Sequence, residues 1–263
     1  MFTHFVASLN QRKNRLYDHL AKRVGGCVLC GQTSGEMPAS PRLCAGCAET
    51  LTHTCLDDEP HPRCTQCAHL LHTAEPLCGD CMTDPPAFDR SVVFADYVGQ
   101  MQHALLQFKF HHALHLAPLL ADGLRHALSE YAQTQRPDML VLVPALPSRV
   151  QQRGFNPLRL IMQHIDLRVI WPSNTPVFRP DALMRVHHDQ LQIHVKPDQR
   201  RKQVKNAFAL AADFSPLGQH IAVIDDIITT GATLHEIAHT LKQSGARQVD
   251  NVLIARTPKS PKL

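Results

Sequence analysis

The chain has 263 residues, with 27 Lys and Arg against 23 Asp and Glu, which gives a formal net charge of +4. This length is enough for one large domain, or for a medium domain with a small appendage. Aromatic residues make up only 5% of the chain, which argues against a platform of aromatic rings that stacks nucleic-acid bases. No apolar run approaches the length of a membrane-spanning helix, so we expect a soluble, cytoplasmic protein without membrane insertion.

Residues 1–26 predict an amphipathic, basic helix. Apolar residues recur at helical spacing, and the segment contains five basic residues but only one acidic residue, Asp18. Such a helix either packs on the protein with its charges in solvent, or meets phosphate groups. The apolar positions are Phe2, Phe5, Leu9, Leu16, Leu20 and Val24, and the basic ones are Arg12, Lys13, Arg15, Lys22 and Arg23.

The cysteines form the clearest local pattern. All nine lie between residues 27 and 81, and eight of them form four Cys-x-x-Cys pairs. Each pair can offer two thiolates to one tetrahedral ion, so residues 27–83 predict a double zinc ribbon with one or two structural Zn²⁺ sites. Disulfides are disfavoured because the N-terminus lacks a secretion signal. The predicted ligands are Cys27, Cys30, Cys44, Cys47, Cys64, Cys67, Cys78 and Cys81, with Cys55 left over.

Spacing alone leaves both sequential and interleaved pairing of these units open. Eight thiolates and two Zn²⁺ would also bring the formal charge of +4 to about zero, so global charge gives no argument for nucleic acid.

Strands and helices alternate from Phe88 onward, after a linker at 84–86. This alternation predicts an α/β domain over 88–257, with a doubly wound, mostly parallel sheet covered on both faces. In such sheets ligands lie at the carboxyl ends of the strands. The predicted strands are 91–98, 139–143, 167–171, 221–224 and 248–254, and the predicted helices are 105–110, 113–132, 155–165 and 234–245.

Residues 143–156 form a candidate anion-binding loop. Pro144 and Pro147 stiffen it, and Arg149 and Arg153 carry planar guanidinium groups that suit phosphate or diphosphate oxygens. The alternative is two surface arginines on a turn. A second basic run at 196–205 could also meet phosphate groups.

The segment 221–233 is the most informative for function. An apolar strand ends in two carboxylates, and a glycine between threonines then precedes a helix whose amino end favours an anion. The carboxylates would repel phosphate, so they suit sugar hydroxyls and, indirectly, a divalent cation. This arrangement predicts a ribose 5-phosphate site at Asp225, Asp226, Thr229, Thr230, Gly231, Ala232 and Thr233. An ordinary strand, turn and helix with exposed acids is the alternative, and a Walker loop is excluded because no Gly-Lys-Ser or Gly-Lys-Thr is present.

This segment resembles the phosphoribosyl diphosphate (PRPP) signature of type I phosphoribosyltransferases. Together with the Cys-x-x-Cys units, Phe-Lys-Phe at 108–110 and Arg-Gly-Phe-Asn at 153–156, the chain resembles the ComF family of competence-associated proteins, from about residue 25 to 256. The resemblance implies a double zinc ribbon joined to a type I phosphoribosyltransferase domain. It also implies a cytoplasmic role in handling single-stranded DNA during natural transformation.

By position, the resemblance implies that the acids and 229–233 hold the ribose 5-phosphate of PRPP with Mg²⁺, and that the catalytic positions Lys109, Arg149 and Arg153 face the diphosphate. The chain has Val-Pro-Ala-Leu-Pro-Ser where the family often has Val-Pro-Val-Pro-Leu-His, and Gln203 replaces the usual Asn. The flexible catalytic loop, expected within 186–205, is therefore the least defined part.

Three functions stay open. The first is a PRPP-binding protein that handles incoming single-stranded DNA in DNA uptake. The second is an active phosphoribosyltransferase with an unknown acceptor, for which no activating base stands out. The third is a zinc-ribbon module that docks on a competence helicase or a recombination-loading protein.

Overall fold

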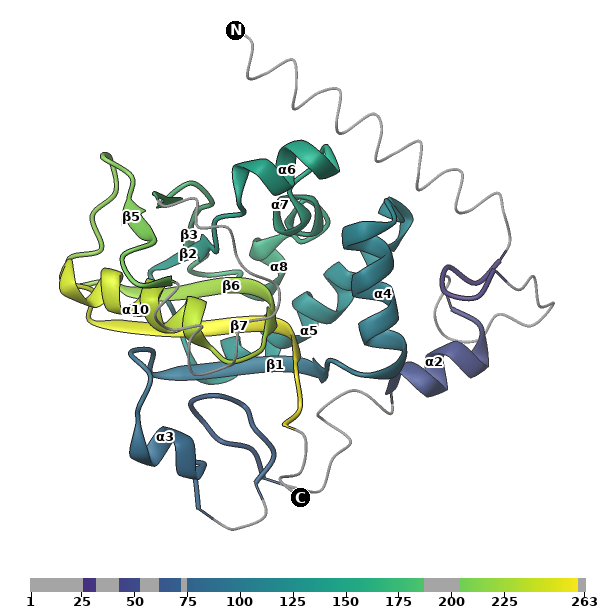
Figure 1. Ribbon diagram of the computed structural model, residues 1–263, viewed down its shortest axis with the longest axis horizontal. Coiled ribbons are helices and arrows are strands. Elements are labelled where there is room, and N and C mark those ends of the chain that lie inside the picture. Colours follow the sequence, from purple (N-terminus) through teal and green to yellow (C-terminus); the bar gives the residue numbers. More distant parts are fainter. Residues whose placement is uncertain (1–25, 32–42, 53–61, 72–74, 187–203, 260–263) are drawn as a thin grey trace, which may run out of the picture.

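A five-stranded parallel sheet forms the centre of the computed structural model, which describes residues 26–31, 43–52, 62–71, 75–186 and 204–259 (Figure 1). The strand order is β1-β7-β6-β2-β3, and every neighbouring pair is parallel. The predicted parallel α/β fold is thus confirmed. The strands are β1 (Arg90–Asp96), β2 (Met139–Leu142), β3 (Val177–Arg179), β6 (His220–Ile228) and β7 (Gln248–Arg256).

Apolar runs place β6 and β7 in the middle of the sheet, because a parallel strand covered on both faces needs continuous hydrophobic sequence. Ala222 and Ile224 belong to the core on one face, and Ile221 and Val223 belong to the core on the other. The first face is covered by α4 (Gly99–Phe110), η2 (Leu114–Leu116), α5 (Ala117–Thr134), α7 (Pro157–Met162) and α8 (Leu167–Ile170). The second is covered by α10 (Ala232–Gln243) and the antiparallel pair β4 (Leu183–Arg185) and β5 (Phe208–Leu210).

The chain leaves two adjacent strands in opposite directions. From β2 it passes through α6 (Pro147–Arg153), α7 and α8 on the first face to β3, whereas from β6 it passes through α10 on the second face to β7. The carboxyl ends of β2 and β6 are therefore a topological switch point, where open α/β sheets form their ligand crevice.

A buried polar cluster ties the amino end of β6 to its neighbours. Tyr131 Oη donates to Asp250 Oδ2 at 2.9 Å, and His220 Nε2 lies 2.8 Å from the same oxygen. Asp250 is fully buried, so these bonds offset part of the cost of burying its carboxylate by giving partners to Oδ2.

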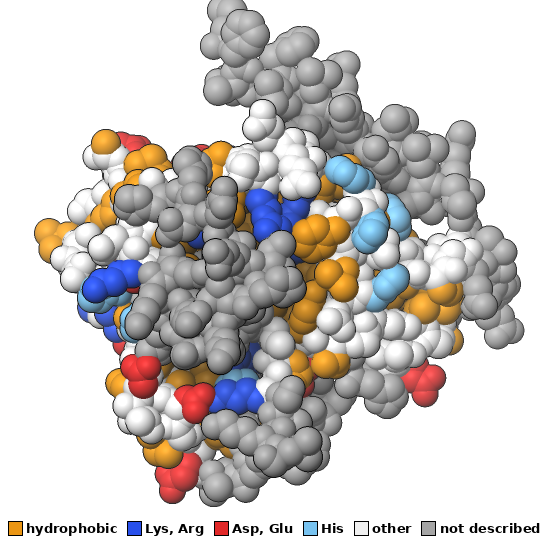
Figure 2. All heavy atoms as spheres, viewed as in Figure 1, with side chains coloured by type: hydrophobic (Ala, Val, Ile, Leu, Met, Phe, Trp, Pro, Cys, Tyr) orange, Lys and Arg blue, Asp and Glu red, His pale blue; other side chains and the backbone are white. Residues whose placement is uncertain are grey.

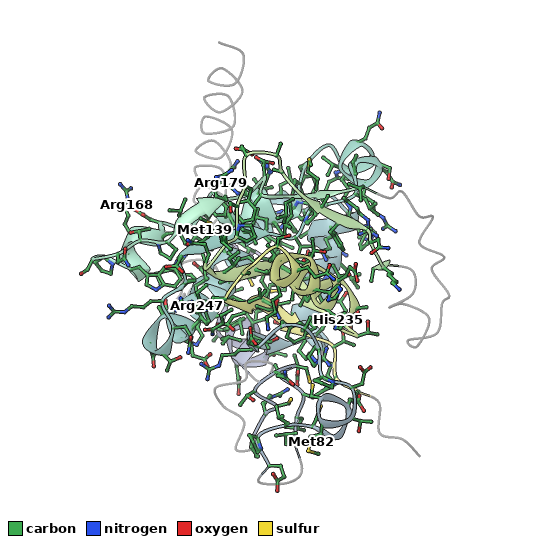
Figure 3. All side chains as sticks on the ribbon, turned by 90° about the vertical axis from the view of Figure 1, so that its left-hand side faces the viewer. Met82, Met139, Arg168, Arg179, His235 and Arg247 are labelled. Carbon is green, nitrogen blue, oxygen red and sulfur yellow. The ribbon has the colours of Figure 1, made fainter. Side chains whose placement is uncertain are left out.

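The two cysteine-bearing units lie on different sides of the sheet domain. Helix α2 (Ala45–Thr52) packs beside α4, whereas residues 62–71 and α3 (Gly79–Thr83) lie along the outer edge of β1 (Figure 1). Ser91 N donates to Thr65 O at 3.2 Å, so the second unit covers an otherwise open strand edge. Figure 3 shows Met82 of α3 at the far end of this second unit and His235 of α10 on the sheet domain.

Several predicted elements differ from the structure. Residues 167–171 were expected as a strand, but α8 forms because Asp166 caps its start by accepting from Arg168 N at 3.0 Å. The loop at 143–156 contains α6, which begins at Pro147. Strand β6 continues to Ile228 because β7 pairs with it there, so the two acids lie within the strand. The predicted helix at 1–26 and most of the basic run lie outside the described residues.

None of the described helices is long and apolar enough to cross a membrane.

Candidate functional site

The candidate site, called the crevice below, is the region around the carboxyl end of β2 and the part of β6 that extends beyond it. It begins where the pairing of β2 with β6 ends. The last bond runs from Val143 N to Ile224 O at 3.0 Å, and β6 then continues beside β7 alone. Asp225 and Asp226 lie in this extension, next to the loop that leads from β2 into α6.

An ion pair joins the acids to α4. Lys109 Nζ lies 2.7 Å from Asp226 Oδ2, and Asp226 N donates to Asp225 Oδ1 at 2.9 Å. The side chains of Lys109 and Asp226 are only 15% and 13% exposed, so solvent screens this pair weakly. The structure therefore brings together three of the residues predicted for the site.

Burial raises the pKa of Asp225 to about 8, and the negative charge of Asp226 acts in the same direction. Lys109 opposes the shift. Near neutral pH Asp225 therefore carries a proton, and a cation bound nearby would favour its carboxylate form.

The bend at 229–233 leads directly into α10. Gly231 is the N-cap of this helix with φ of 78°, a conformation that favours glycine, and Thr229 and Thr230 are exposed. Thr230 Oγ1 accepts from Ala232 N at 3.4 Å. The amino end of a 12-residue helix, with its partial positive charge, thus faces the side of the crevice that carries the threonines.

Helix α6, which follows the loop after β2, carries the two predicted arginines. The Arg153 guanidinium lies 4.7 Å from the ring centre of Phe110, at the end of α4. Burial lowers the pKa of Arg153, and Arg149 adds to this while Asp226 opposes it. The cations of α4 and α6 and the acids of β6 therefore share one electrostatic environment, and Figure 2 shows Lys and Arg beside hydrophobic and His side chains over this region.

Two contacts at the site were not predicted from sequence. Phe110 is 50% exposed beneath Arg153, and Arg256 at the end of β7 is buried against the bend. Arg256 Nη1 donates to Ile228 O at 3.3 Å and also to Thr229 O. The sequence feature that could have drawn attention to Arg256 is its position as a single charged residue at the end of an apolar strand.

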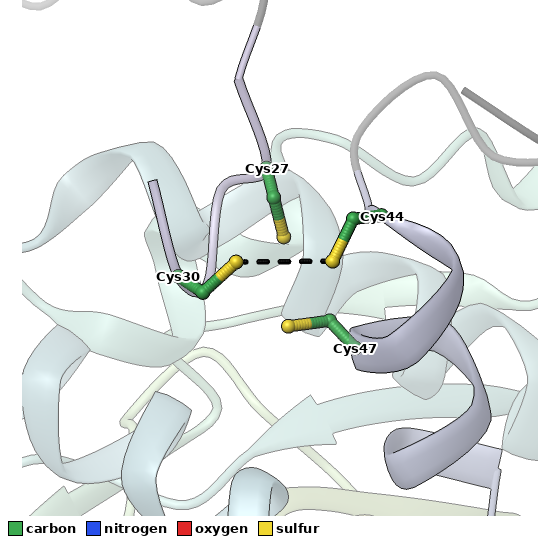
Figure 4. A group of neighbouring side chains, drawn as sticks. All are labelled: Cys27, Cys30, Cys44 and Cys47. Atoms are coloured by element: carbon green, nitrogen blue, oxygen red, sulfur yellow. Dashed lines mark hydrogen bonds between the residues drawn. The ribbon is translucent and has the colours of Figure 1, made fainter. Parts of the chain in front are cut away.

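The first cysteine cluster contains Cys27, Cys30, Cys44 and Cys47, whose Sγ atoms lie within 4.8 Å of one another (Figure 4). Cys30 Sγ and Cys44 Sγ are 3.8 Å apart, which excludes a disulfide of about 2.05 Å. Four sulfurs at about 2.3 Å from a tetrahedral Zn²⁺ are separated by about 3.8 Å, so this donor set fits the ion.

The second cluster contains Cys64, Cys67, Cys78 and Cys81, with Cys67 Sγ and Cys78 Sγ 3.6 Å apart. Both clusters follow the sequential pairing. Hydrogen bonds that the Cys81 thiol donates to Cys64 and Cys67, together with burial, raise the pKa of Cys81, and the negative charge of the neighbouring thiolates acts in the same direction. A bound cation would offset that negative charge, so the second donor set also fits a metal ion.

The raised pKa of Asp225 gives a pH-dependent stability. A carboxyl that binds its proton more tightly in the folded chain than in the unfolded chain makes the free energy of unfolding fall as pH rises toward 8. Asp225→Asn removes this loss. Its stability gain over the unmodified chain should grow by up to about 1.4 kcal/mol per pH unit between about pH 5.5 and 8, and then level off.

Urea unfolding at about pH 5.5, 7 and 8.5 measures this gain. Asp213→Asn serves as the control because the Asp213 side chain is 81% exposed. A stability gain of Asp225→Asn that does not change with pH would contradict the prediction.

Comparison with known proteins gives a consistent set of relatives. No family model matches the chain. It is 33% identical over 204 residues to DNA utilization protein YhgH of Salmonella typhimurium, covering 74% of this chain and 84% of that protein. It is 28% identical over 218 residues to Competence protein F of Haemophilus influenzae, covering 81% and 90%. Competence protein ComFC of Streptococcus pneumoniae is 23% identical over 243 residues, covering 88% and 99%.

Similar solved structures include a purine phosphoribosyltransferase from Pyrococcus horikoshii, with a TM-score of 0.34 and 14% identity over 55% of this chain and 79% of that one. Another is an allosteric regulatory enzyme of purine biosynthesis, with a TM-score of 0.30 and 15% identity, of which the chain spans 25%. These TM-scores are low, so these structures give no information about a ligand of this chain. The identity and coverage of the curated relatives are sufficient for assignment: the chain belongs to the ComF family.

Proposed function

We propose that the crevice binds PRPP with Mg²⁺. The observation that carries the proposal is the Lys109–Asp226 ion pair at the switch point, beside the amino end of α10. The helix amino end suits the 5-phosphate of the ligand, the cations suit its diphosphate, and the adjacent acids suit the sugar.

Each wall of the crevice takes one part of the ligand in this proposal. The bend at 229–233 holds the 5-phosphate through its backbone N–H groups and hydroxyls. Asp225 and Asp226 accept hydrogen bonds from the ribose hydroxyls, and a bound Mg²⁺ would offset the negative charge of the diphosphate and of the acids. Arg149 and Arg153 face the diphosphate, where planar guanidinium groups bind two oxygens at once.

Lys109 has a second partner available in this scheme. Without ligand it neutralises Asp226 at 2.7 Å, and a diphosphate with its cation would compete for both charges. Lys109 and Asp226, whose side chains are mostly buried, therefore have a partner of opposite charge both with and without the ligand. The described residues do not define an acceptor, so the proposal is ligand binding and not transfer.

Calorimetry with PRPP and Mg²⁺ tests the site. Asp225→Ala and Lys109→Ala should each weaken binding by about tenfold or more, because each removes a charge-assisted contact worth about 1.5–3 kcal/mol. Asp213→Asn, an exposed acid on the sheet domain, should bind as the unmodified chain does. Equal heats from all four proteins would reject the site.

We also propose that both cysteine clusters hold Zn²⁺. Each would then form a four-thiolate structural site that stabilises a unit with little apolar core. Elemental analysis of the purified chain should give about two zinc ions per chain. Cys44→Ser and Cys78→Ser should each lower this to about one, whereas Cys55→Ser should keep both. A zinc content that is unchanged in Cys44→Ser or Cys78→Ser would contradict the assignment of that cluster.

The names of the relatives support a proposed role in DNA uptake, with incoming single-stranded DNA as a macromolecular partner. The cations of α4 and α6 offer backbone phosphates a binding surface, so contacts should be tolerant of sequence. Docking on a competence helicase or a recombination-loading protein is a further proposal that the family membership motivates.

Fluorescence anisotropy with single-stranded oligonucleotides tests DNA binding. Affinity should fall by about tenfold or more between about 50 and 200 mM salt, because phosphate contacts release counterions. The double variant Arg149→Ala, Arg153→Ala should reduce both affinity and salt dependence. Arg168→Ala is the matched control, since Arg168 is 80% exposed on α8 and points outward in Figure 3. No binding even at low salt would remove this role.

A further inference from the structure

Arg256 is a buried cation between the bend at 229–233 and the second cysteine cluster. It is 3% exposed, and its Nη1 donates to the carbonyl oxygens of Ile228 and Thr229, which open the bend. Among the described residues no carboxylate lies within ion-pair distance of it, and its Nε has no hydrogen-bond partner. A buried guanidinium without a counter-charge costs several kcal/mol.

The acid nearest to Arg256 along the strand pairing is already occupied. Asp96 of β1 lies opposite Arg256 in the register, but both of its carboxylate oxygens accept from Arg63, at 3.1 and 3.0 Å. Arg63 also donates to Ala68 O at 3.3 Å and directly precedes Cys64. This ion pair thus attaches the second cluster to the carboxyl end of β1, at the position that lies opposite Arg256 of β7 in the strand register.

The thiols of this cluster are the acidic groups that act on Arg256. Burial lowers its pKa, and the negative potential of Cys67, Cys78, Cys81 and Cys64 opposes that effect. Four thiolates around one divalent ion carry a net charge of about −2, which neutral thiols lack. A filled second cluster would therefore supply the counter-charge for Arg256.

We propose that Arg256 is a positioning residue that couples metal occupancy of the second cysteine cluster to ligand binding at the bend. With the metal bound, Arg256 stays in place and fixes the carbonyl groups of residues 228 and 229, so the following N–H groups face the ligand. Without the metal, the bend loses this support. The inference rests on the proposed binding of PRPP, and coupling of this kind acts equally in both directions.

The first cluster provides an internal control. It packs on α4 through α2, and Gln100 Nε2 donates to Cys47 Sγ at 3.7 Å. None of its described hydrogen bonds involves β7 or the bend. Loss of its metal should therefore leave the bend as it is.

The experiment compares the full-length zinc-loaded chain with Cys78→Ser, Cys44→Ser and Arg256→Gln. PRPP affinity, measured by calorimetry with Mg²⁺, should fall by about tenfold in Cys78→Ser and Arg256→Gln and by less than about twofold in Cys44→Ser. Amide hydrogen exchange at 228–233 should become faster in the same two variants only. In the double variant of Cys78 and Arg256 the effects should not add.

Hydrogen exchange separates this inference from the proposed function, because it needs no ligand. If the unmodified chain does not bind PRPP, the proposed function fails, and exchange at 228–233 still decides whether Arg256 links the cluster to the bend. Equal exchange and equal affinity in Cys78→Ser and Cys44→Ser, with one zinc lost from each, would overturn the coupling. If Cys78→Ser does not fold, unchanged exchange at the bend in zinc-loaded Arg256→Gln overturns it.

Discussion

The crevice depends on strand β6 extending beyond the end of its neighbour β2. Pairing of β6 with β2 ends at Ile224, whereas its pairing with β7 continues to Ile228. The extension keeps the acids on a rigid element while leaving one side of the strand open to a ligand. The opposite directions in which the chain leaves β2 and β6 then bring α6 and α10 around that opening, and α4, which follows β1, adds Lys109.

The two acids of the crevice are neutralised within the protein itself. Lys109 neutralises Asp226, and burial keeps a proton on Asp225. Arg153 rests on an aromatic ring, which stabilises a cation with less solvent around it. If PRPP binds with Mg²⁺ as proposed, Lys109 and Asp226 can exchange their ion pair for contacts with the ligand and its cation.

Local patterns made much of this organisation predictable from sequence. The strand, bend and helix over 220–243 follow from apolar residues, a glycine and helical spacing within one short segment. The segment 167–170 was predicted as a strand because its Leu, Val and Ile residues favour that structure. It forms a helix because Asp166 caps its start. The ring beneath Arg153 and the contacts of Arg256 join segments far apart in the chain, so spacing could not reveal them. The cysteine units are close in sequence, but their spacing fits sequential and interleaved pairing equally well.

The buried cluster of Tyr131, His220 and Asp250 has a consequence at the far end of the sheet. His220 begins β6, about 17 Å of extended chain before Asp225. A shift of the strand by a single position would exchange the faces on which the two acids lie. Tyr131 and His220 hold the amino end of β6 against α5 and β7 through these bonds. They therefore help to fix the strand register that places Asp226 beside Lys109, although they lie at the other end of the strand.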